Sequence, residues 1–211
     1  DWVRAFRPRN VILENVPGLV RDQRLKKLKS ILDELGYTYD VRIQNAADFG
    51  VPQRRYRMIL LARKDGPVVF PEPDKSYVTV RDAIGKLKPP EETSDDPLHV
   101  TSKRRSELVL RRIRAIPKDG GSRSHLPEEL RLKCHQKTSG FRDVYGRMAW
   151  DDVAPTLTSG CINPSKGRFL HPDQDREITL REAALLQGFP PDYKFSLRRG
   201  RYPVAAMIGN A

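Results

Sequence analysis

The sequence has little cysteine and no long apolar run. Its 211 residues include two cysteines, Cys134 and Cys161, which lie far apart and outside any paired motif. This spacing argues against a disulfide framework and a zinc site, and it fits a reducing compartment. No apolar run is long enough to span a bilayer, and the first residues show no signal-peptide pattern. The composition is that of a globular protein without a membrane segment.

Acidic residues are outnumbered by basic ones. The chain has 39 Lys plus Arg against 27 Asp plus Glu, a net charge of +12 and a pI of about 9.9. This balance favours a polyanionic partner, most simply nucleic acid, with general solubility as the alternative. Residues 101–147 contain thirteen Lys or Arg and five Asp or Glu, a net charge of +8. Because the charge is so concentrated, a footprint for a phosphate backbone is the favoured interpretation.

Residues 10–16, Asn-Val-Ile-Leu-Glu-Asn-Val, predict a strand that ends at a functional position. The apolar run from Val11 to Leu13 is typical of a strand buried on both faces, and Pro17 with Gly18 ends it. Ligands bind at the carboxyl ends of strands in open α/β sheets, so Glu14 is placed for chemistry or recognition. The alternative is a solvated strand end followed by a turn.

The next stretch predicts a sheet layered with helices. Apolar residues recur at helical spacing from Leu25 to Leu35, and Gly36 ends this amphipathic helix. Residues 39–43 and 58–62 predict two further strands. A strand, a helix and two strands in this order indicate the α/β class.

The loop at residues 45–57 is basic. It carries Arg54, Arg55 and Arg57, and it would lie beside the end of the Glu14 strand in a regular sheet. The planar fork of arginine suits phosphates and the carbonyl oxygens of bases. A solvated basic loop is the alternative.

From residue 66 onward the amino-acid composition changes, and frequent prolines indicate a domain boundary. A short helix is expected at residues 80–87, and short strands are expected at 145–150 and 155–158. Thr179 and Glu182 form a capping box that opens a helix ended by Gly188. A last helix is expected from Pro203 to Ile208. Simple packing would also account for these helices.

Four blocks, in order, resemble the DNA cytosine methyltransferases that methylate carbon 5 of the base. Residues 14–16 match the family's Glu-Asn-Val motif, and residues 53–57 match its Gln-Arg-Arg-x-Arg motif. Residues 176–190 match the Leu-Thr-x-Arg-Glu-Ala-Ala block that continues into Gln-Gly-Phe-Pro, and residues 209–211 resemble the opening of the Gly-Asn-Ala-Val-Pro motif. The resemblance implies part of a Rossmann-like, S-adenosylmethionine-dependent methyltransferase sheet plus a smaller, loop-rich target-recognition domain.

The resemblance also implies that three segments of the chain have different functions. Residues 1–65 would be the C-terminal part of the catalytic domain, 66–175 the DNA-binding domain, and 176–211 a segment that packs back on the catalytic domain. The implied activity is methyl transfer from S-adenosylmethionine to a cytosine flipped out of double-stranded DNA. The implied setting is the bacterial cytoplasm at the nucleoid, with a restriction-modification system as one context.

The family's mechanism assigns roles to three charged residues. Carbon 5 is not nucleophilic enough to take a methyl group, so a cysteine thiolate of the enzyme first adds to carbon 6. The resemblance places Glu14 at ring nitrogen 3, where a carboxyl with some proton character eases this addition. It places Arg57 at the base oxygen, where charge accumulates, with Arg55 supporting the same pocket.

The remaining roles implied by the resemblance are structural or concern binding. Asn15, Gln53 and Arg181 are expected to support the site, and Asn210 falls where the family contacts S-adenosylmethionine. No metal is implied. Contacts with DNA are expected from arginines of the basic zone: Arg104, Arg105, Arg111, Arg112 and Arg123.

The match lacks two parts of the family pattern. A Gly-rich cofactor loop and a Pro-Cys nucleophile motif precede the Glu-Asn-Val strand in the family, and neither cysteine here follows a proline. Met207 stands where the family usually has Gln. The chain is therefore expected to be the C-terminal portion of a methyltransferase, inactive by itself. The alternatives are a subunit completed by a complementary chain, a non-catalytic DNA-binding fragment, and a tRNA cytosine methyltransferase.

Overall fold

The computed structural model describes two compact units. It covers residues 2–74, 76–92, 95–101, 105–136 and 143–211. Unit 1 comprises residues 1–50 and 55–76, and unit 2 comprises residues 51–54 and 77–211. The three functional segments implied by the resemblance, residues 1–65, 66–175 and 176–211, stay a prediction.

Unit 1 is built on a three-stranded antiparallel sheet with the order β1-β3-β2. The strands are β1 Asn10–Asn15, β2 Thr38–Asn45 and β3 Tyr56–Arg63. All three expected strands are therefore confirmed. The register pairs Glu14 with Ile59 and Gln44 with Arg57, which places β3 between its two neighbours.

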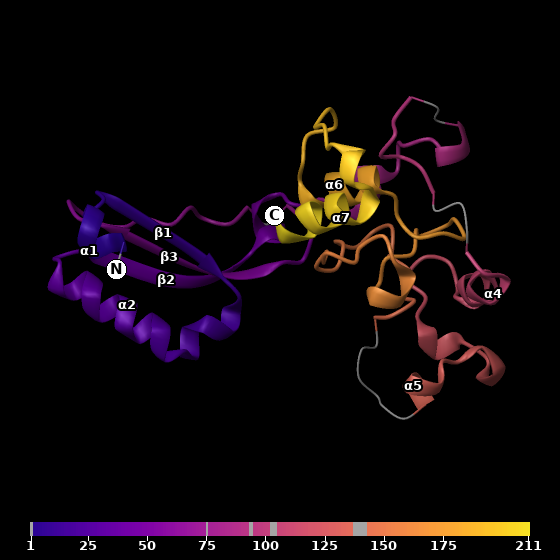
Figure 1. Ribbon diagram of the computed structural model, residues 1–211, viewed down its shortest axis with the longest axis horizontal. Coiled ribbons are helices and arrows are strands. Elements are labelled where there is room, and N and C mark those ends of the chain that lie inside the picture. Colours follow the sequence, from indigo (N-terminus) through magenta and orange to yellow (C-terminus); the bar gives the residue numbers. More distant parts are fainter. Residues whose placement is uncertain (1, 75, 93–94, 102–104, 137–142) are drawn as a thin grey trace. The chain divides into compact units, whose positions relative to one another are not determined.

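A helix packs along one face of this sheet (Figure 1). It is α2, Gln23–Glu34, preceded by the short helix α1, Trp2–Phe6, and by a turn of 3₁₀ helix, η1, Pro17–Arg21. Leu25 and Leu32 of α2 are buried against Met58 and Leu60 of β3. The spacing of the leucines follows the helical period, so the expected amphipathic helix is confirmed.

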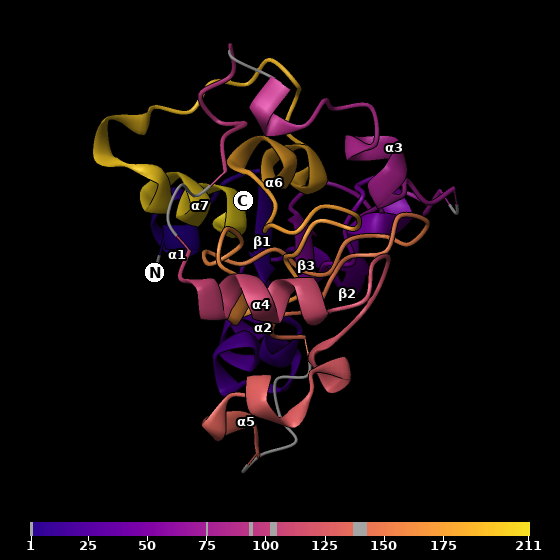
Figure 2. The same ribbon diagram turned by 90° about the vertical axis from the view of Figure 1, so that its right-hand side faces the viewer.

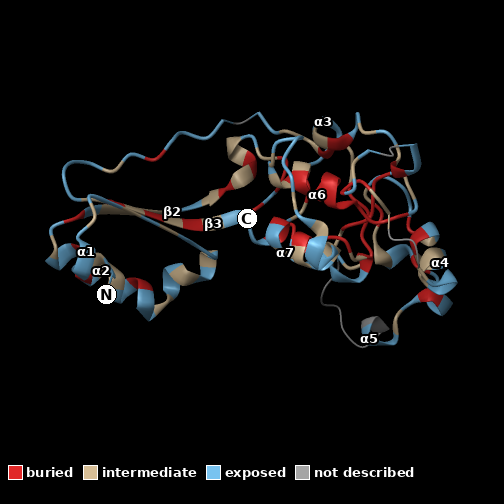
Figure 3. Ribbon diagram, turned by 45° about the horizontal axis from the view of Figure 1, so that its top comes forward, coloured by how far each residue is buried: buried red, intermediate tan, exposed pale blue. Residues whose placement is uncertain are grey.

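The opposite face of the sheet is partly exposed. Figure 3 colours each residue by how far it is buried. In β1, Val11 and Leu13 join the core under α2, whereas Ile12 between them is 73% exposed. Successive side chains of a strand point to opposite faces, so this alternation means that one face alone has a helix. Within the residues described, α2 covers a single face. The expectation that β1 is buried on both faces is therefore wrong for unit 1.

Unit 2 is organised around α6, Leu180–Gln187 (Figure 2). Leu180, Ala183, Ala184 and Leu186 are fully buried. Helices α3 and α7 pack on α6, and α4 covers a second apolar cluster that contains Ile113. The other helices of the unit are α3 Val80–Ile84, α4 Glu107–Ala115, α5 Lys133–Gln136 and α7 Arg201–Asn210.

Local sequence signals set the ends of the central helix. The Thr179 hydroxyl accepts the Glu182 backbone N–H at 3.1 Å, and the Glu182 carboxylate accepts the Thr179 backbone N–H at 2.7 Å. Gly188 follows the helix in the left-handed conformation, with φ of 93°. The predicted capping box and C-terminal stop are thus confirmed.

The short strands expected at residues 145–150 and 155–158 do not form among the described residues. Isolated bridges replace them, such as those between Arg147 and Leu170 and between Gln53 and Ala154. A fully buried side chain, Arg147, holds these loops together instead. Its guanidinium donates to four backbone carbonyls and one carboxylate, those of Ile113, Ile116, His171, Gln174 and Asp175.

Candidate active site

Glu14 and Arg57 form an ion pair on one face of the unit 1 sheet. The Arg57 Nε atom lies 2.7 Å from Oε1 of Glu14. Glu14 is opposite Ile59, and Arg57 lies two residues before Ile59 on β3, so both side chains belong to the same face. The Glu14 side chain is 55% exposed and that of Arg57 is 23% exposed. The pair can therefore be reached from solvent.

Arg55 extends this pair into a three-charge cluster. Its side chain is buried, and burial is the main cause that lowers the pKa of its guanidinium. The nearby charge of Arg57 lowers this pKa further, while Glu14 raises it. The structure therefore brings the three predicted catalytic residues together in unit 1. Their catalytic roles stay predictions.

Backbone turns on both sides of the cluster are fixed by asparagines. The Asn15 side chain accepts the Val16 N–H at 2.9 Å, directly after Glu14. The buried Asn45 side chain accepts the N–H groups of Ala47, at 3.4 Å, and Arg55, at 3.0 Å. Sequence reasoning missed Asn45, although an Asn before a short helical turn is a common cap.

Gln53 belongs to unit 2, so the motif at residues 53–57 contributes to both units. Its side chain is fully buried, donates to Gln187 Oε1 at 2.6 Å and accepts the Leu157 N–H at 2.9 Å. Gln187 in turn donates to the Ala211 carbonyl at 2.6 Å. Gln53 thus ties together three segments of unit 2 that are distant in sequence.

Arg181 binds two loops of unit 2. Its Nε donates to the Asp96 carboxylate at 2.5 Å, and its Nη1 donates to the Tyr193 carbonyl at 3.0 Å. Burial by itself would raise the pKa of Asp96, but the hydrogen bonds from Arg181 and the Leu98 N–H, together with the Arg181 charge, lower it below its ordinary value. Asp96 was not among the predicted site residues, and its place in an acidic, proline-rich stretch gave no signal of this role.

Asn210 lies exposed at the end of α7. The preceding Gly209 is buried, and a Cβ atom there would lie 2.2 Å from the Thr158 carbonyl carbon. Glycine therefore allows α7 to approach the backbone of residues 158–159. A single exposed amide does not make a cofactor site, so the assignment of Asn210 to S-adenosylmethionine stays a prediction.

The five predicted DNA-binding arginines have different surroundings. Arg105 donates to Glu177 at 2.7 Å and Arg112 to the Leu130 carbonyl at 2.8 Å, whereas Arg111 is exposed. Arg123 is half-buried, and Arg104 lies outside the described residues. Contact with DNA stays a prediction for all five.

The two cysteines differ in exposure. Cys161 is completely buried, and burial raises the pKa of its thiol to about 12. Such a thiol is protonated near neutral pH and is a poor nucleophile. Cys161 therefore lacks the setting of an activated thiolate. Cys134, in contrast, is exposed.

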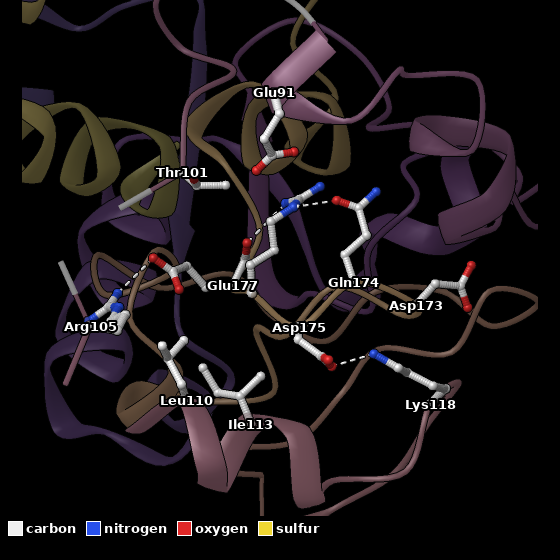
Figure 4. Close-up of a pocket in the computed structure, with 11 residues that line it drawn as sticks. Glu91, Thr101, Arg105, Leu110, Ile113, Lys118, Asp173, Gln174, Asp175 and Glu177 are labelled. Carbon is white, nitrogen blue, oxygen red and sulfur yellow. Dashed lines mark hydrogen bonds and ion pairs between the residues drawn. The ribbon is translucent and has the colours of Figure 1, made fainter. Parts of the chain in front are cut away.

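A separate cavity of about 520 Å³ lies in unit 2 (Figure 4). It is lined by charged side chains that mostly pair with one another, including Lys118 with Asp175 and Arg105 with Glu177. It contains none of the three predicted catalytic residues. In the described part of the chain no cluster of His, Cys, Asp or Glu could hold a metal ion, and none of the helices there is long and apolar enough to cross a membrane.

Comparison with known proteins gives matches over the whole chain. The family model described as C-5 cytosine-specific DNA methylase matches residues 1–211. The chain is 40% identical to the Type II methylase M.HgiDII of Herpetosiphon aurantiacus, covering 99% of this chain and 62% of that protein. It is 36% identical to the Type II methyltransferase M1.BsuMI of Bacillus subtilis, covering 99% of this chain and 49% of that protein.

A solved structure shares the fold. It is a prophage-encoded DNA modification methyltransferase of E. coli, with a TM-score of 0.67 and 20% sequence identity. The similarity covers 99% of this chain and 66% of that one. The α/β fold expected from the sequence is therefore confirmed.

Proposed function

Because the chain belongs to the C-5 cytosine-specific DNA methylase family, we propose that it is part of an enzyme that methylates carbon 5 of cytosine in DNA. The methyl donor in this proposal is S-adenosylmethionine, which supplies an electrophilic methyl group when bound. The partner is double-stranded DNA, which the basic segment at residues 101–147 suits by charge. Restriction-modification is the favoured context, since the relatives are named as Type II enzymes.

The observation that carries the proposal is the Glu14–Arg57 pair, with Nε and Oε1 2.7 Å apart. Cytosine presents ring nitrogen 3 and the oxygen on carbon 2 side by side. A carboxyl that holds a proton at nitrogen 3 and a guanidinium at the adjacent oxygen would bind this edge together. The Glu14 and Arg57 side chains share one face and are close enough for a single base to contact both.

The role of the pair follows from where charge moves. When a thiolate adds to carbon 6, its electron pair forms the new carbon–sulfur bond, and ring electrons shift toward carbon 5, nitrogen 3 and the oxygen. In its protonated form Glu14 would donate a proton or a hydrogen bond at nitrogen 3, and Arg57 would stabilise negative charge on the oxygen. Carbon 5 then becomes nucleophilic enough to take the methyl group of S-adenosylmethionine, whose carbon–sulfur bond breaks to release S-adenosylhomocysteine. Transfer of the carbon 5 proton to a base, return of the nitrogen 3 proton to Glu14 and expulsion of the thiolate from carbon 6 complete the reaction.

We also propose that these 211 residues alone do not catalyse methyl transfer. They contain no Pro-Cys pair, and the Cys161 thiol is held protonated by burial. The nucleophile and most of the cofactor contacts would come from residues outside this sequence, in the same protein or in a complementary chain. The chain spans 62% and 49% of the two bacterial relatives, which leaves room for such residues in proteins of their length.

The test is transfer of labelled methyl groups from S-adenosylmethionine to DNA. The 211-residue chain alone should transfer none. A protein or mixture that also contains the Gly-rich and Pro-Cys motifs should produce 5-methylcytosine, detected by mass spectrometry of the digested DNA. Transfer by the chain alone would overturn the proposed dependence on outside residues. DNA binding without 5-methylcytosine in the completed protein would instead support the non-catalytic alternative.

A further inference from the structure

Arg55 lies just outside the regular structure of unit 1. Strand β3 begins at Tyr56, and the last pair in its ladder with β2 joins Tyr56 to Asn45. Residues 51–54 belong to unit 2, so the chain enters unit 1 at Arg55. The ladder that includes Arg57 therefore stops one residue short of Arg55, and the Arg55 backbone must be held by other groups.

The side chain of Asn45 supplies part of this hold. Its Oδ1 atom accepts the Arg55 N–H at 3.0 Å and the Ala47 N–H at 3.4 Å. The Ala46 N–H donates to the Arg55 carbonyl at 2.9 Å. Both backbone groups of Arg55 are thus bonded to residues 45 and 46. Asn45 is buried, and a buried N–H that loses its acceptor is costly, so this contact is a strong constraint on the local backbone.

The orientation of the Asn45 amide is fixed as well. Its Nδ2 atom donates to Oδ1 of Asp48 at 3.3 Å, within the short 3₁₀ helix η2, Ala46–Phe49. The amide oxygen therefore faces the Arg55 N–H, and the amide nitrogen faces a carboxylate. An aspartate at position 45 would accept the same backbone bonds but would place two carboxylates side by side. An alanine would make neither contact.

The position of Arg55 matters because its charge belongs to the Glu14–Arg57 cluster. The Arg55 guanidinium interacts with the charges of both residues. Like charges repel, so the Arg55 and Arg57 guanidinium groups tend to separate unless the backbone that carries them is fixed. A displacement of about 1 Å near a reacting group can lower a rate about 10²-fold. The hold on Arg55 thus sets the charge pattern that a bound base meets.

Resting on the proposed function, we propose that Asn45 is a positioning residue for methyl transfer, which fixes the backbone of Arg55 and so keeps its guanidinium beside Glu14 and Arg57. Asn45 acts through Arg55 and does not contact the base itself. This role differs from simple support of the fold. A residue that only stabilised unit 1 would change the amount of folded enzyme and leave the rate constant of the folded enzyme unchanged.

A double-mutant cycle in the complete enzyme tests the assignment. The four proteins are wild type, Asn45→Ala, Arg55→Met and the variant with both changes. Single-turnover methyl transfer with enzyme in excess gives the rate constant of the chemical step. Asn45→Ala alone should lower this rate constant about 10–100-fold. In the Arg55→Met background the same change should lower it less than about twofold, because the group that Asn45 positions is already gone. Asn45→Ser takes the place of Asn45→Ala if the latter yields too little folded enzyme.

Thr38→Val is the matched control. Thr38 is the first residue of β2, at the opposite end of the strand from Asn45, and its hydroxyl donates to the carbonyls of Gly66 at 2.7 Å and Arg63 at 3.2 Å. The control therefore also removes bonds from a β2 side chain to the backbone of unit 1. Its rate constant should stay within about twofold of wild type, because these bonds lie far along the strand from the cluster.

Exchange of the donor and the acceptor provides a rescue. Asn45→Asp combined with Asp48→Asn keeps the net charge, keeps an acceptor for the Arg55 N–H and reverses the bond between the two side chains. This swap variant should recover a rate constant within about threefold of wild type. Amide hydrogen exchange measures the hold directly: the Arg55 amide should exchange at least about tenfold faster in Asn45→Ala than in wild type.

An equal loss of rate from Asn45→Ala in both backgrounds would overturn the proposal, because Asn45 would then act independently of the Arg55 side chain. A swap variant as slow as Asn45→Ala, or a wild-type rate in Asn45→Ala, would overturn it as well. A wild-type enzyme that forms no 5-methylcytosine would contradict the proposed function. Amide exchange would still decide whether Asn45 fixes the Arg55 backbone, and an unchanged exchange rate in Asn45→Ala would show that it does not.

Discussion

Arg57 reaches Glu14 diagonally across two adjacent strands, with its Nε atom 2.7 Å from the carboxylate oxygen. The carboxylate is 55% exposed, and ion pairs of this kind contribute about 0–1 kcal/mol to folding stability. Removing the pair should therefore change folding stability little, whereas the proposed function requires that its removal slow methyl transfer strongly.

Glu14→Gln in the complete enzyme should lower the rate of methyl transfer roughly 10²–10⁴-fold, because an amide cannot deliver a proton to the base. Arg57→Ala should lower it about 10²–10³-fold through the lost stabilisation of charge. Single-turnover transfer measures the chemical step, and DNA affinity should change by less than about threefold. Arg111→Gln is the contrasting variant, expected to weaken binding with little effect on the chemical step. If all three variants affected rate and binding alike, the role assignment would be wrong.

Gln53→Ala should destabilise unit 2. The change leaves the Leu157 N–H and the Gln187 side chain without their buried partner, at a cost of about 1–3 kcal/mol for each group left unsatisfied. Urea unfolding should show a lower midpoint. Gln23→Ala is the matched control, since Gln23 is exposed and its loss should shift stability by less than about 0.5 kcal/mol. Equal midpoints for the two variants would contradict the bridging role of Gln53.

His171 should make stability depend on pH. Burial lowers the pKa of this imidazole to about 4, from an ordinary value near 6.5. The unfolded chain therefore binds a proton at a pH where the folded chain does not, and stability falls as pH drops from about 6.5 toward 4. The loss contributed by this group is at most about 3 kcal/mol.

The measurement is urea unfolding at several pH values. His171→Asn retains an acceptor toward the Asp173 and Gln174 N–H groups, which the His171 ring accepts at 3.2 Å and 3.1 Å, but cannot titrate. Its stability should fall less steeply than that of wild type between pH 6.5 and 4.5. An unchanged slope in this window would show that another group is responsible.

The cysteines should react at very different rates. Cys134 is exposed, whereas the buried Cys161 has its pKa raised to about 12. When the native 211-residue chain is treated with a thiol reagent at pH 8, one equivalent of thiol should therefore react quickly. The second equivalent should react only in denaturant. Cys134→Ser should abolish the fast phase. A fast phase that survived this change would mean that Cys161 is accessible.

Several elements could be predicted because their signals are local. The capping box of Thr179 and Glu182 depends on residues three apart, and the stop at Gly188 depends on one residue. The strand before Glu14 was likewise visible as an apolar run. The family match then indicated that Glu14 and Arg57 share a site, and the sheet register places them on one face.

Other features depend on contacts between distant segments. No local pattern distinguishes Arg147, which is fully buried and binds carbonyls, from exposed Arg111 in the same basic stretch. From the number of charges alone, Arg105 and Arg112 would be expected to be available to DNA. Both instead donate hydrogen bonds to groups of the protein. The exposure of Ile12 was hidden as well, because an apolar run does not reveal which faces of a sheet are covered.

Ile12 also matters for handling the purified chain. β1 is an edge strand, bonded in the described sheet to β3 alone, and an apolar side chain beside a free strand edge invites pairing with another molecule. Mutual repulsion between copies carrying a net charge of +12 opposes such pairing. Added salt weakens that repulsion, so concentrated samples are expected to aggregate as ionic strength rises, the reverse of ordinary salting-in.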